Sequence, residues 1–130
     1  TTLDLLLTFF AWLLTSSNRY LRDKVSKAMI EILKVNFYFC ENLLKKFENV
    51  NDPYVIQRLY GIVFGACVKR RAENKTVYSS LAHYVYKAIF DKAKVYPDIL
   101  LRDYARLIIE RYRHEYSDDL PFEISKITPP

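Results

Sequence analysis

Residues 52–69 read DPYVIQRLYGIVFGACVK, and they decide the fold that the sequence predicts. Asp52 is a good N-cap, and Pro53 suits the first helical position, where a missing N–H costs nothing. The apolar residues that follow recur at helical spacing and cover nearly the whole circumference. Because a helix that is apolar nearly all round is covered on several sides, we expect this one to be the central and most buried helix.

Gly61 and Gly65 lie four residues apart on one face of this helix, and they are the only glycines in the chain. Small residues at this spacing let a neighbouring helix approach closely, in soluble bundles as in membrane helix pairs. Gln57 and Arg58 interrupt the apolar run, which is also shorter than the roughly 20 residues that a bilayer requires. The pattern therefore favours a close helix crossing inside a soluble protein.

The composition indicates one all-α domain. The chain has 130 residues, of which 51% are apolar and 27% are charged, as is usual for a globular protein. With two glycines, β-turns and hairpins are hard to build, so helices are expected throughout. Cys40 and Cys67 lie in apolar helical runs, which suits buried thiols in a reducing cytoplasm, although the sequence leaves a disulfide open. From the ends at Thr1 and Pro130 we also expect a piece of a longer protein.

Six helices are predicted from the apolar periodicity and the turn residues. The first, residues 3–14, carries a thin polar stripe through Asp4 and Thr8, and we expect its neighbours to cover it. The others are expected at 19–34, 37–47, 52–69, 77–94 and 99–116, with Asn18 and Thr76 in the caps of the second and fifth. Residues 1–116 then form the helical domain, and 117–130, with three prolines and no helical period, form an extended tail or connector.

The helices suggest three similar antiparallel pairs. Residues 21–25 read LRDKV and residues 101–105 read LRDYA, while residues 55–59, VIQRL, keep the apolar frame between them. The starts of these segments are 34 and 46 residues apart, about 40 on average, which is the period of helical repeats of the HEAT and armadillo kind. The segments resemble the second helices of HEAT repeats. The sequence therefore predicts a fragment of a HEAT-like α-solenoid, with a non-repetitive helical bundle as the alternative.

A narrower resemblance is carried by three phrases, WLLTSSNRYLRDKVSKAMIEIL (12–33), ENVNDPYVIQRLYGIVFG (48–65) and ISKITPP (124–130). Together they resemble a helical-repeat region of very large bacterial ATP-binding proteins of the STAND NTPase type, some of which act in antiviral defence. The resemblance implies a non-catalytic scaffold or sensor segment that relays partner contacts to an NTPase elsewhere in the polypeptide. The chain has no GxxxxGK[ST] loop, so nothing about ATP is assigned to its residues.

Candidate catalytic and metal-binding residues are few. Glu110 and His114 lie one helical turn apart, but a zinc site needs three or four ligands, and no second cluster in the sequence supplies them. Ser79 and Ser80 lie near His83 on one helix, without the strained turn, oxyanion hole or orienting acid of a hydrolase. We therefore expect no enzyme in this segment, and neither a metal nor a cofactor.

Charge is the feature that bears on partners. The 20 Lys and Arg residues exceed the 15 Asp and Glu residues by five, and much of the excess lies on the second helices of the predicted pairs. In stacked helical pairs these helices line the concave surface, where the field attracts an acidic partner. The predicted partner-binding residues are Arg22, Lys27, Arg58, Arg102 and Arg106.

Two functions compete for this basic face. The preferred one is protein interaction, with a separate partner or with other domains of the same polypeptide; the alternative is a nucleic-acid-binding α-solenoid that grips phosphates. The same arginines also suit a structural role, pairing with interleaved acids or tying one repeat to the next. A contiguous basic groove favours nucleic acid, whereas alternating signs or exposed apolar and aromatic residues favour a protein partner.

Overall fold

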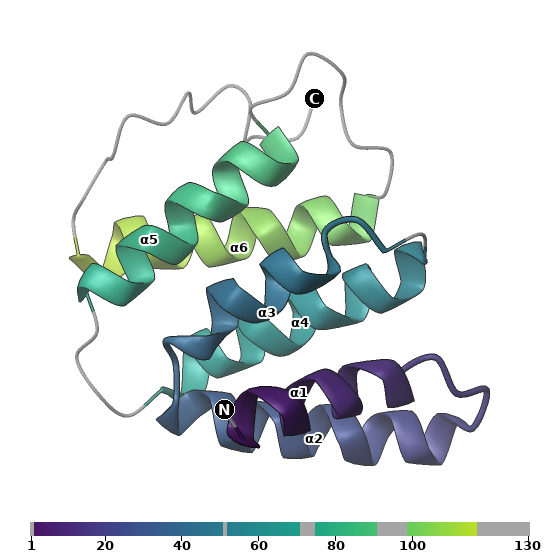
Figure 1. Cartoon of the computed structure of the whole chain (residues 1–130). Helices are drawn as coiled ribbons and strands as arrows, with labels where there is room; N and C mark the ends of the chain where they lie inside the picture. Colours follow the sequence, from purple (N-terminus) through teal and green to yellow (C-terminus); the bar gives the residue numbers. More distant parts are fainter. Residues whose placement is uncertain (1, 51, 71–74, 91–98, 117–130) are drawn as a thin grey trace. The chain divides into compact units, whose positions relative to one another are not determined.

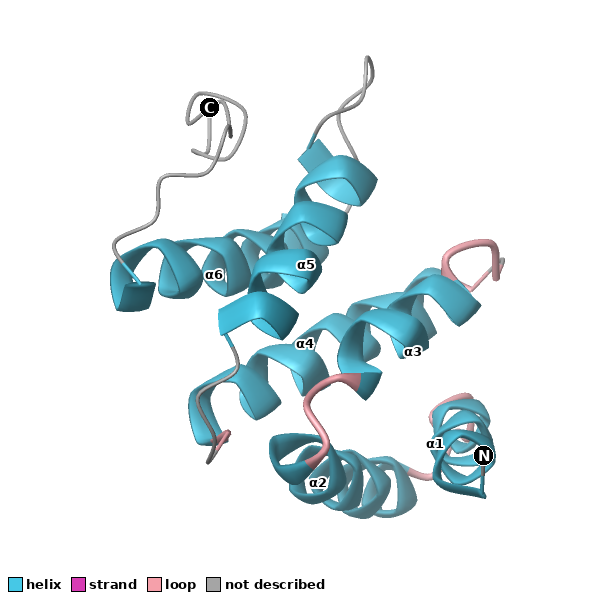
Figure 2. Ribbon diagram, turned by 60° about the vertical axis from the view of Figure 1, so that its left-hand side comes forward, coloured by secondary structure: helices cyan, strands magenta, loops and turns pink. Residues whose placement is uncertain are grey.

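The computed structural model describes residues 2–50, 52–70, 75–90 and 99–116. Its elements are α1 (Thr2–Leu13), α2 (Arg19–Val35), α3 (Phe39–Phe47), α4 (Pro53–Lys69), α5 (Lys75–Val85), a π-helix (Tyr86–Phe90) that continues α5, and α6 (Ile99–Tyr116) (Figure 1). Within these described ranges every regular element is a helix, and none is a strand (Figure 2). For the described residues, the prediction of an all-α fold with six α-helices is confirmed.

Contacts divide the chain into two compact units, residues 1–72 and 73–130. The first unit holds α1 to α4, and the second holds α5 and α6. The predicted tail at 117–130 lies outside the described residues, as do residues 91–94 at the predicted end of the fifth helix. Each unit therefore has its own helix packing.

Asn18 and Asp52 begin the two longest helices of the first unit, as predicted. The Oδ1 of Asn18 accepts a hydrogen bond from the N–H of Leu21 at 3.1 Å. The Oδ1 of Asp52 accepts from the N–H groups of Tyr54 and Val55 at 3.0 and 3.3 Å. These bonds satisfy N–H groups that have no partner inside the helix, so α2 and α4 start where their capping residues stand.

The most buried described helix is α4. Its buried side chains outnumber those of every other described helix, and they are Val55, Leu59, Tyr60, Ile62, Val63, Ala66 and Cys67. Three neighbours, α1, α2 and α3, contact it. The apolar residues on several sides of α4 are thus explained by neighbours on several sides, and the prediction of a central helix is confirmed for the first unit.

α2 and α4 approach each other closely at Gly65. A Cβ atom placed on Gly65 would lie 2.8 Å from Cδ1 and 3.2 Å from Cγ1 of Ile30 in α2. Carbon atoms in favourable contact lie about 3.5–4.0 Å apart, so even a methyl group would displace the isoleucine. The missing side chain at Gly65 lets Ile30 lie against the backbone of α4, so the predicted close approach is confirmed at Gly65, one of the two glycines.

In the described structure α1 is covered on one side only. Leu7 and Ala11 are buried, and the carboxylate of Asp4 accepts hydrogen bonds from Lys46 and Asn42 of α3. The polar stripe therefore faces protein, because α3 offers it a cation and an amide. The apolar residues on the opposite side of α1 face outward, so among the described residues the expected cover is found on one side of the helix only.

α5 and α6 pack against each other through tyrosines. The buried hydroxyl of Tyr78 donates a hydrogen bond to the backbone oxygen of Ile108 at 2.9 Å. The ring of Tyr112 lies 5.2 Å from the ring of Tyr78 and 5.2 Å from that of Tyr116. Aromatic pairs at such separations add about 0.5–1.5 kcal/mol each beyond the area they bury. Tyr78 and Tyr112 thus belong to the core of this unit.

α5 differs from its prediction. It begins at Lys75, so Thr76 lies in the first helical turn instead of capping the helix. The backbone then changes to a π-helix from Tyr86 to Phe90. A π-turn holds more residues than an α-turn, which here brings Ile89 and Phe90 together into the core. An apolar pattern read at the α-helical period does not reveal such a change.

Replacing Gly65 by Leu should lower the free energy of unfolding by about 1–3 kcal/mol, because the new side chain would overlap Ile30. Urea unfolding followed by circular dichroism measures the loss. Val68→Leu is the matched control, since Val68 lies on the same helix and is 45% exposed, and it should change stability by less than about 0.5 kcal/mol. A Gly65→Leu variant as stable as the wild type would contradict the close packing of α2 on α4.

Candidate functional site

Arg22 and Arg58 both donate to backbone carbonyl groups of the turn that follows α1. The Nη1 of Arg22 lies 2.9 Å from the oxygen of Ser16, and the Nη1 of Arg58 lies 2.9 Å from the oxygen of Leu14. Carbonyl groups at a helix C-terminus lack partners within the helix and carry partial negative charge, so a cation suits them. Arg58 therefore holds α4 to the residue that follows α1, and Arg22 holds α2 to the turn between α1 and α2.

Of the predicted partner-binding residues in the first unit, Lys27 is exposed, whereas Arg22 and Arg58 are half-buried. The guanidinium of Arg58 also lies over the ring of Tyr54, 5.9 Å from its centroid. A partner would contact the whole side chain of Lys27 but only part of the side chains of Arg22 and Arg58. The sequence pattern of a helix does not show that Arg22 and Arg58 join it to another segment, because the groups that accept their hydrogen bonds are backbone carbonyls.

Arg102 and Arg106 lie on α6 in the second unit, and both are half-buried. The Nη1 of Arg106 is 3.1 Å from Oε2 of Glu110, and its Nη2 is 3.9 Å from Oδ1 of Asp103. The acids interleaved with these arginines thus pair with Arg106, at the spacings that bring helical side chains together. The predicted site is therefore divided between the two units, with three residues in the first and two in the second.

Ion pairs of alternating sign occur on the helices of the first unit as well. They are Glu31–Lys34, Glu41–Lys45 and Asp4–Lys46. All three are partly exposed, so each contributes only about 0–1 kcal/mol to stability. These ion pairs matter more for phosphate binding than for stability. An acid beside each of these lysines weakens the attraction of this surface for phosphates.

The outer face of α1 is an apolar surface that the sequence pattern did not predict. It consists of Leu5, Leu6, Phe9 and Trp12, which are 70%, 39%, 58% and 49% exposed. These residues fall at i, i+1, i+4 and i+7, so they share one side of the helix. The largest contiguous apolar patch on a typical monomer covers about 300–600 Å² and is often functional. The sequence places the polarity of Asp4 and Thr8 on a single side of α1, but it does not show that this side faces α3.

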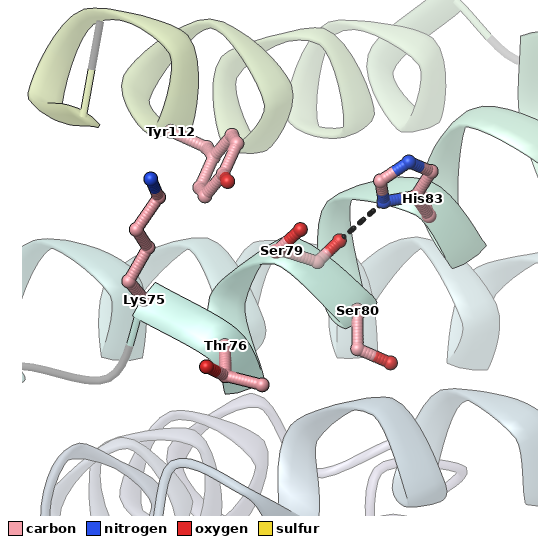
Figure 3. A pocket seen from close by; sticks show the side chains of 6 residues that line it. All are labelled: Lys75, Thr76, Ser79, Ser80, His83 and Tyr112. Carbon is pink, nitrogen blue, oxygen red and sulfur yellow. Dashed lines mark hydrogen bonds between the residues drawn. The ribbon is translucent and has the colours of Figure 1, made fainter. Parts of the chain in front are cut away.

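A pocket of about 580 Å³ lies between α5 and α6 (Figure 3). Five residues of α5 and one of α6 line it, and they are Lys75, Thr76, Ser79, Ser80, His83 and Tyr112. The Nδ1 of His83 lies 2.9 Å from the backbone oxygen of Ser79 and must carry the proton, since a carbonyl only accepts. This bond joins the ring to the carbonyl of the residue four positions earlier. It is not the bond from histidine to a hydroxyl group that activates a nucleophile.

Within the described residues, no group of three or more His, Cys, Asp and Glu side chains is placed to hold a metal ion. Glu110, which the sequence sets one turn from His114, forms its ion pair with Arg106. As for membranes, no helix in the described part of the chain combines the length and the apolar character needed to cross one.

Cys40 and Cys67 are fully buried thiols in the first unit, as their apolar surroundings in the sequence predict. Burial raises the pKa of the Cys40 thiol well above its usual value, and the neighbouring Cys67 raises it further. The thiolate is the form that attacks electrophiles and binds metals. Cys40 is therefore poorly suited to either role in the folded chain.

Arg58→Met should lower the free energy of unfolding by about 1–2 kcal/mol, because it keeps the apolar stem and removes a charged hydrogen bond to Leu14. Lys27→Met is the control, since Lys27 is exposed, and it should stay within about 0.5 kcal/mol of the wild type. Denaturant unfolding of the two variants gives both values. Equal, small losses would show that Arg58 does not hold α4 to α1.

The raised pKa of Cys40 predicts that stability falls in alkaline solution. The folded-state pKa exceeds the unfolded one, so this contribution is complete below the usual thiol pKa and is lost as the pH rises toward the folded value. In that window the wild type should lose up to about 1.4 kcal/mol per pH unit more than Cys40→Ala does. Urea titrations from pH 7.5 to 10.5 compare the two slopes, and parallel slopes would rule out the linkage.

Comparison with known proteins found no relative of this chain. No protein-family model matches the chain, and neither a curated protein nor a solved structure matches it. The resemblance to HEAT repeats and to STAND NTPases therefore stays a prediction from the sequence.

Proposed function

We propose that this chain is a non-catalytic scaffold or sensor segment that binds protein, and that it belongs to a larger bacterial, cytoplasmic ATP-binding protein of the STAND type. The observation that carries the proposal is the outer face of α1, where four large apolar side chains meet solvent. Burial of apolar area is the main source of affinity in protein association. A surface of this kind is suited to a protein partner or to another domain of the same polypeptide.

The contacts inside the first unit support a repeat architecture. α1 contacts α2, and α3 contacts α4, so helices adjacent in the sequence pack together. α1 also contacts α3, and α2 contacts α4, so first helices meet first helices and second helices meet second helices. Stacked helical pairs of the HEAT type have this relation, in which each pair contacts its neighbour. We therefore keep the HEAT-like solenoid as the proposed architecture of the chain.

The state of the cations favours protein over nucleic acid. Arg22 and Arg58 donate to carbonyl groups of their own chain, and Arg106 lies between two acids. A phosphate contact adds affinity when a cation displaces condensed counterions from the nucleic acid. Arg22 and Arg58 are half-buried and hold part of each guanidinium against their own chain, and the charge of Arg106 is opposed by two acids, so each is less available to a phosphate than an exposed cation. Of the five predicted residues, Lys27 and Arg102 are therefore the best ones to replace in a test of phosphate binding.

We expect the chain to bind nucleic acid weakly at about 0.15 M salt, with an affinity poorer than about 1 µM and a salt slope of roughly −3 to −4. Fluorescence anisotropy with labelled single- and double-stranded DNA and RNA measures both quantities. Lys27→Glu with Arg102→Glu is the test variant, and Lys27→Gln with Arg102→Gln shows the effect of neutralisation alone. Submicromolar binding that the charge reversal abolishes would replace the protein-binding proposal by the nucleic-acid one.

A further inference from the structure

The pocket between α5 and α6 is lined by side chains that can donate hydrogen bonds. Lys75 contributes an ammonium group, and the other five residues contribute three aliphatic hydroxyls, the ring of His83 and the phenol of Tyr112. None of the described residues that line the pocket is Asp or Glu. Its volume of about 580 Å³ lies within the range of roughly 300–1,000 Å³ that is typical of small-molecule sites. The lining therefore suits a small anion, and not a hard metal cation, which carboxylates usually hold.

The acids of the two helices do not cancel the charge of Lys75. α5 contains no Asp or Glu. On α6, each acid lies 3.1 to 3.9 Å from an arginine of the same helix, in the pairs Asp103–Arg106, Glu110–Arg106 and Glu115–Arg111. Lys75 is therefore the charge that these two helices bring to the pocket, and its field attracts an anion.

Lys75 and Ser79 have polar groups that a ligand can reach. Among the described residues, no acid pairs with the ammonium of Lys75, and no group forms a hydrogen bond with the hydroxyl of Ser79. Lys75 is exposed and Ser79 is half-buried. The two residues are four positions apart, so their side chains are neighbours on one side of α5, the side next to Tyr112 in Figure 3. A single ligand group can thus contact both.

These groups fit a phosphate better than a carboxylate. A tetrahedral phosphate accepts hydrogen bonds in several directions, which suits the point charge of a lysine together with a hydroxyl group. A flat carboxylate is matched by the planar fork of an arginine, and no arginine is among the described residues that line the pocket. A phosphate group alone would fill only part of about 580 Å³, so an organic part has room beside it.

We propose that the pocket between α5 and α6 binds a small organic phosphate, with the phosphate group at Lys75 and Ser79 and the organic part toward His83 and Tyr112. The ring of His83 is held for this contact by its Nδ1, which lies 2.9 Å from the backbone oxygen of Ser79. One ammonium and a few hydroxyls give a dissociation constant on the order of 0.1–1 mM. This inference goes beyond the proposed protein binding, which rests on α1 in the first unit.

Titration of the full chain with glycerol 3-phosphate at constant ionic strength, followed by amide NMR, tests the site. The amide signals of residues 75–83 should shift, with a dissociation constant of at most about 1 mM. Glycerate carries a carboxylate in place of the phosphate, and glycerol carries no charge, so both should bind at least about tenfold more weakly. Inorganic phosphate should also bind more weakly, because it lacks the organic part.

Replacement of the two phosphate contacts tests the assignment to residues. Lys75→Met should weaken binding at least about tenfold, and Ser79→Ala by about two- to tenfold. Lys87→Met is the matched control, because Lys87 is an exposed lysine of the same unit that does not line the pocket, and its effect should stay within about twofold.

Three results would overturn the proposal. The first is a wild type that binds no glycerol 3-phosphate below about 10 mM. The second is an equal loss of binding in the two lysine variants, which would show attraction by charge alone. The third is glycerate, glycerol or inorganic phosphate bound as tightly as glycerol 3-phosphate. None of these results bears on the protein-binding proposal, so the two can fail separately.

Discussion

The first unit depends on the burial of α4 against α1, α2 and α3. This arrangement requires apolar side chains on several sides of one helix and a position where a neighbour can reach its backbone. α4 meets the first requirement with its seven buried residues and the second with Gly65, where Ile30 occupies the space of a side chain. Arg58 adds a polar contact by reaching from α4 to the end of α1. The positions of α1, α2 and α3 thus depend on the side chains of α4 that contact each of them.

Much of this arrangement could be predicted from the sequence, because local chemistry determines it. The caps at Asn18 and Asp52 act through residues two or three positions away, and the burial of α4 follows from its composition. The side of α1 that is covered could not be predicted. Its apolar residues outnumber its polar ones, yet Asp4 faces the protein because Lys46, 42 positions later, lies there. Such a choice depends on tertiary contacts that a helical period does not contain.

The predicted site shows the same division. The pattern found the basic residues of the second helices, and the acids interleaved with them in α6 pair as their spacing suggests. It could not show that Arg22 and Arg58 donate to carbonyl groups, since backbone acceptors leave no trace in the sequence. A charge counted in the sequence is therefore not equal to a charge available to a partner. The apolar side of α1 is accordingly the surface on which we base the proposed protein interaction.

Both ends of α1 are held by residues distant in the sequence. Asp4 near its start is bridged to Lys46, and Leu14 after its end accepts from Arg58, across separations of 42 and 44 residues. α1 therefore cannot detach from either end without breaking contacts that α3 and α4 make, so its order is tied to the cooperative folding of the unit. A surface on such a helix is preorganised. A partner that binds it spends little of its binding free energy on ordering the helix, and more of that energy appears as affinity.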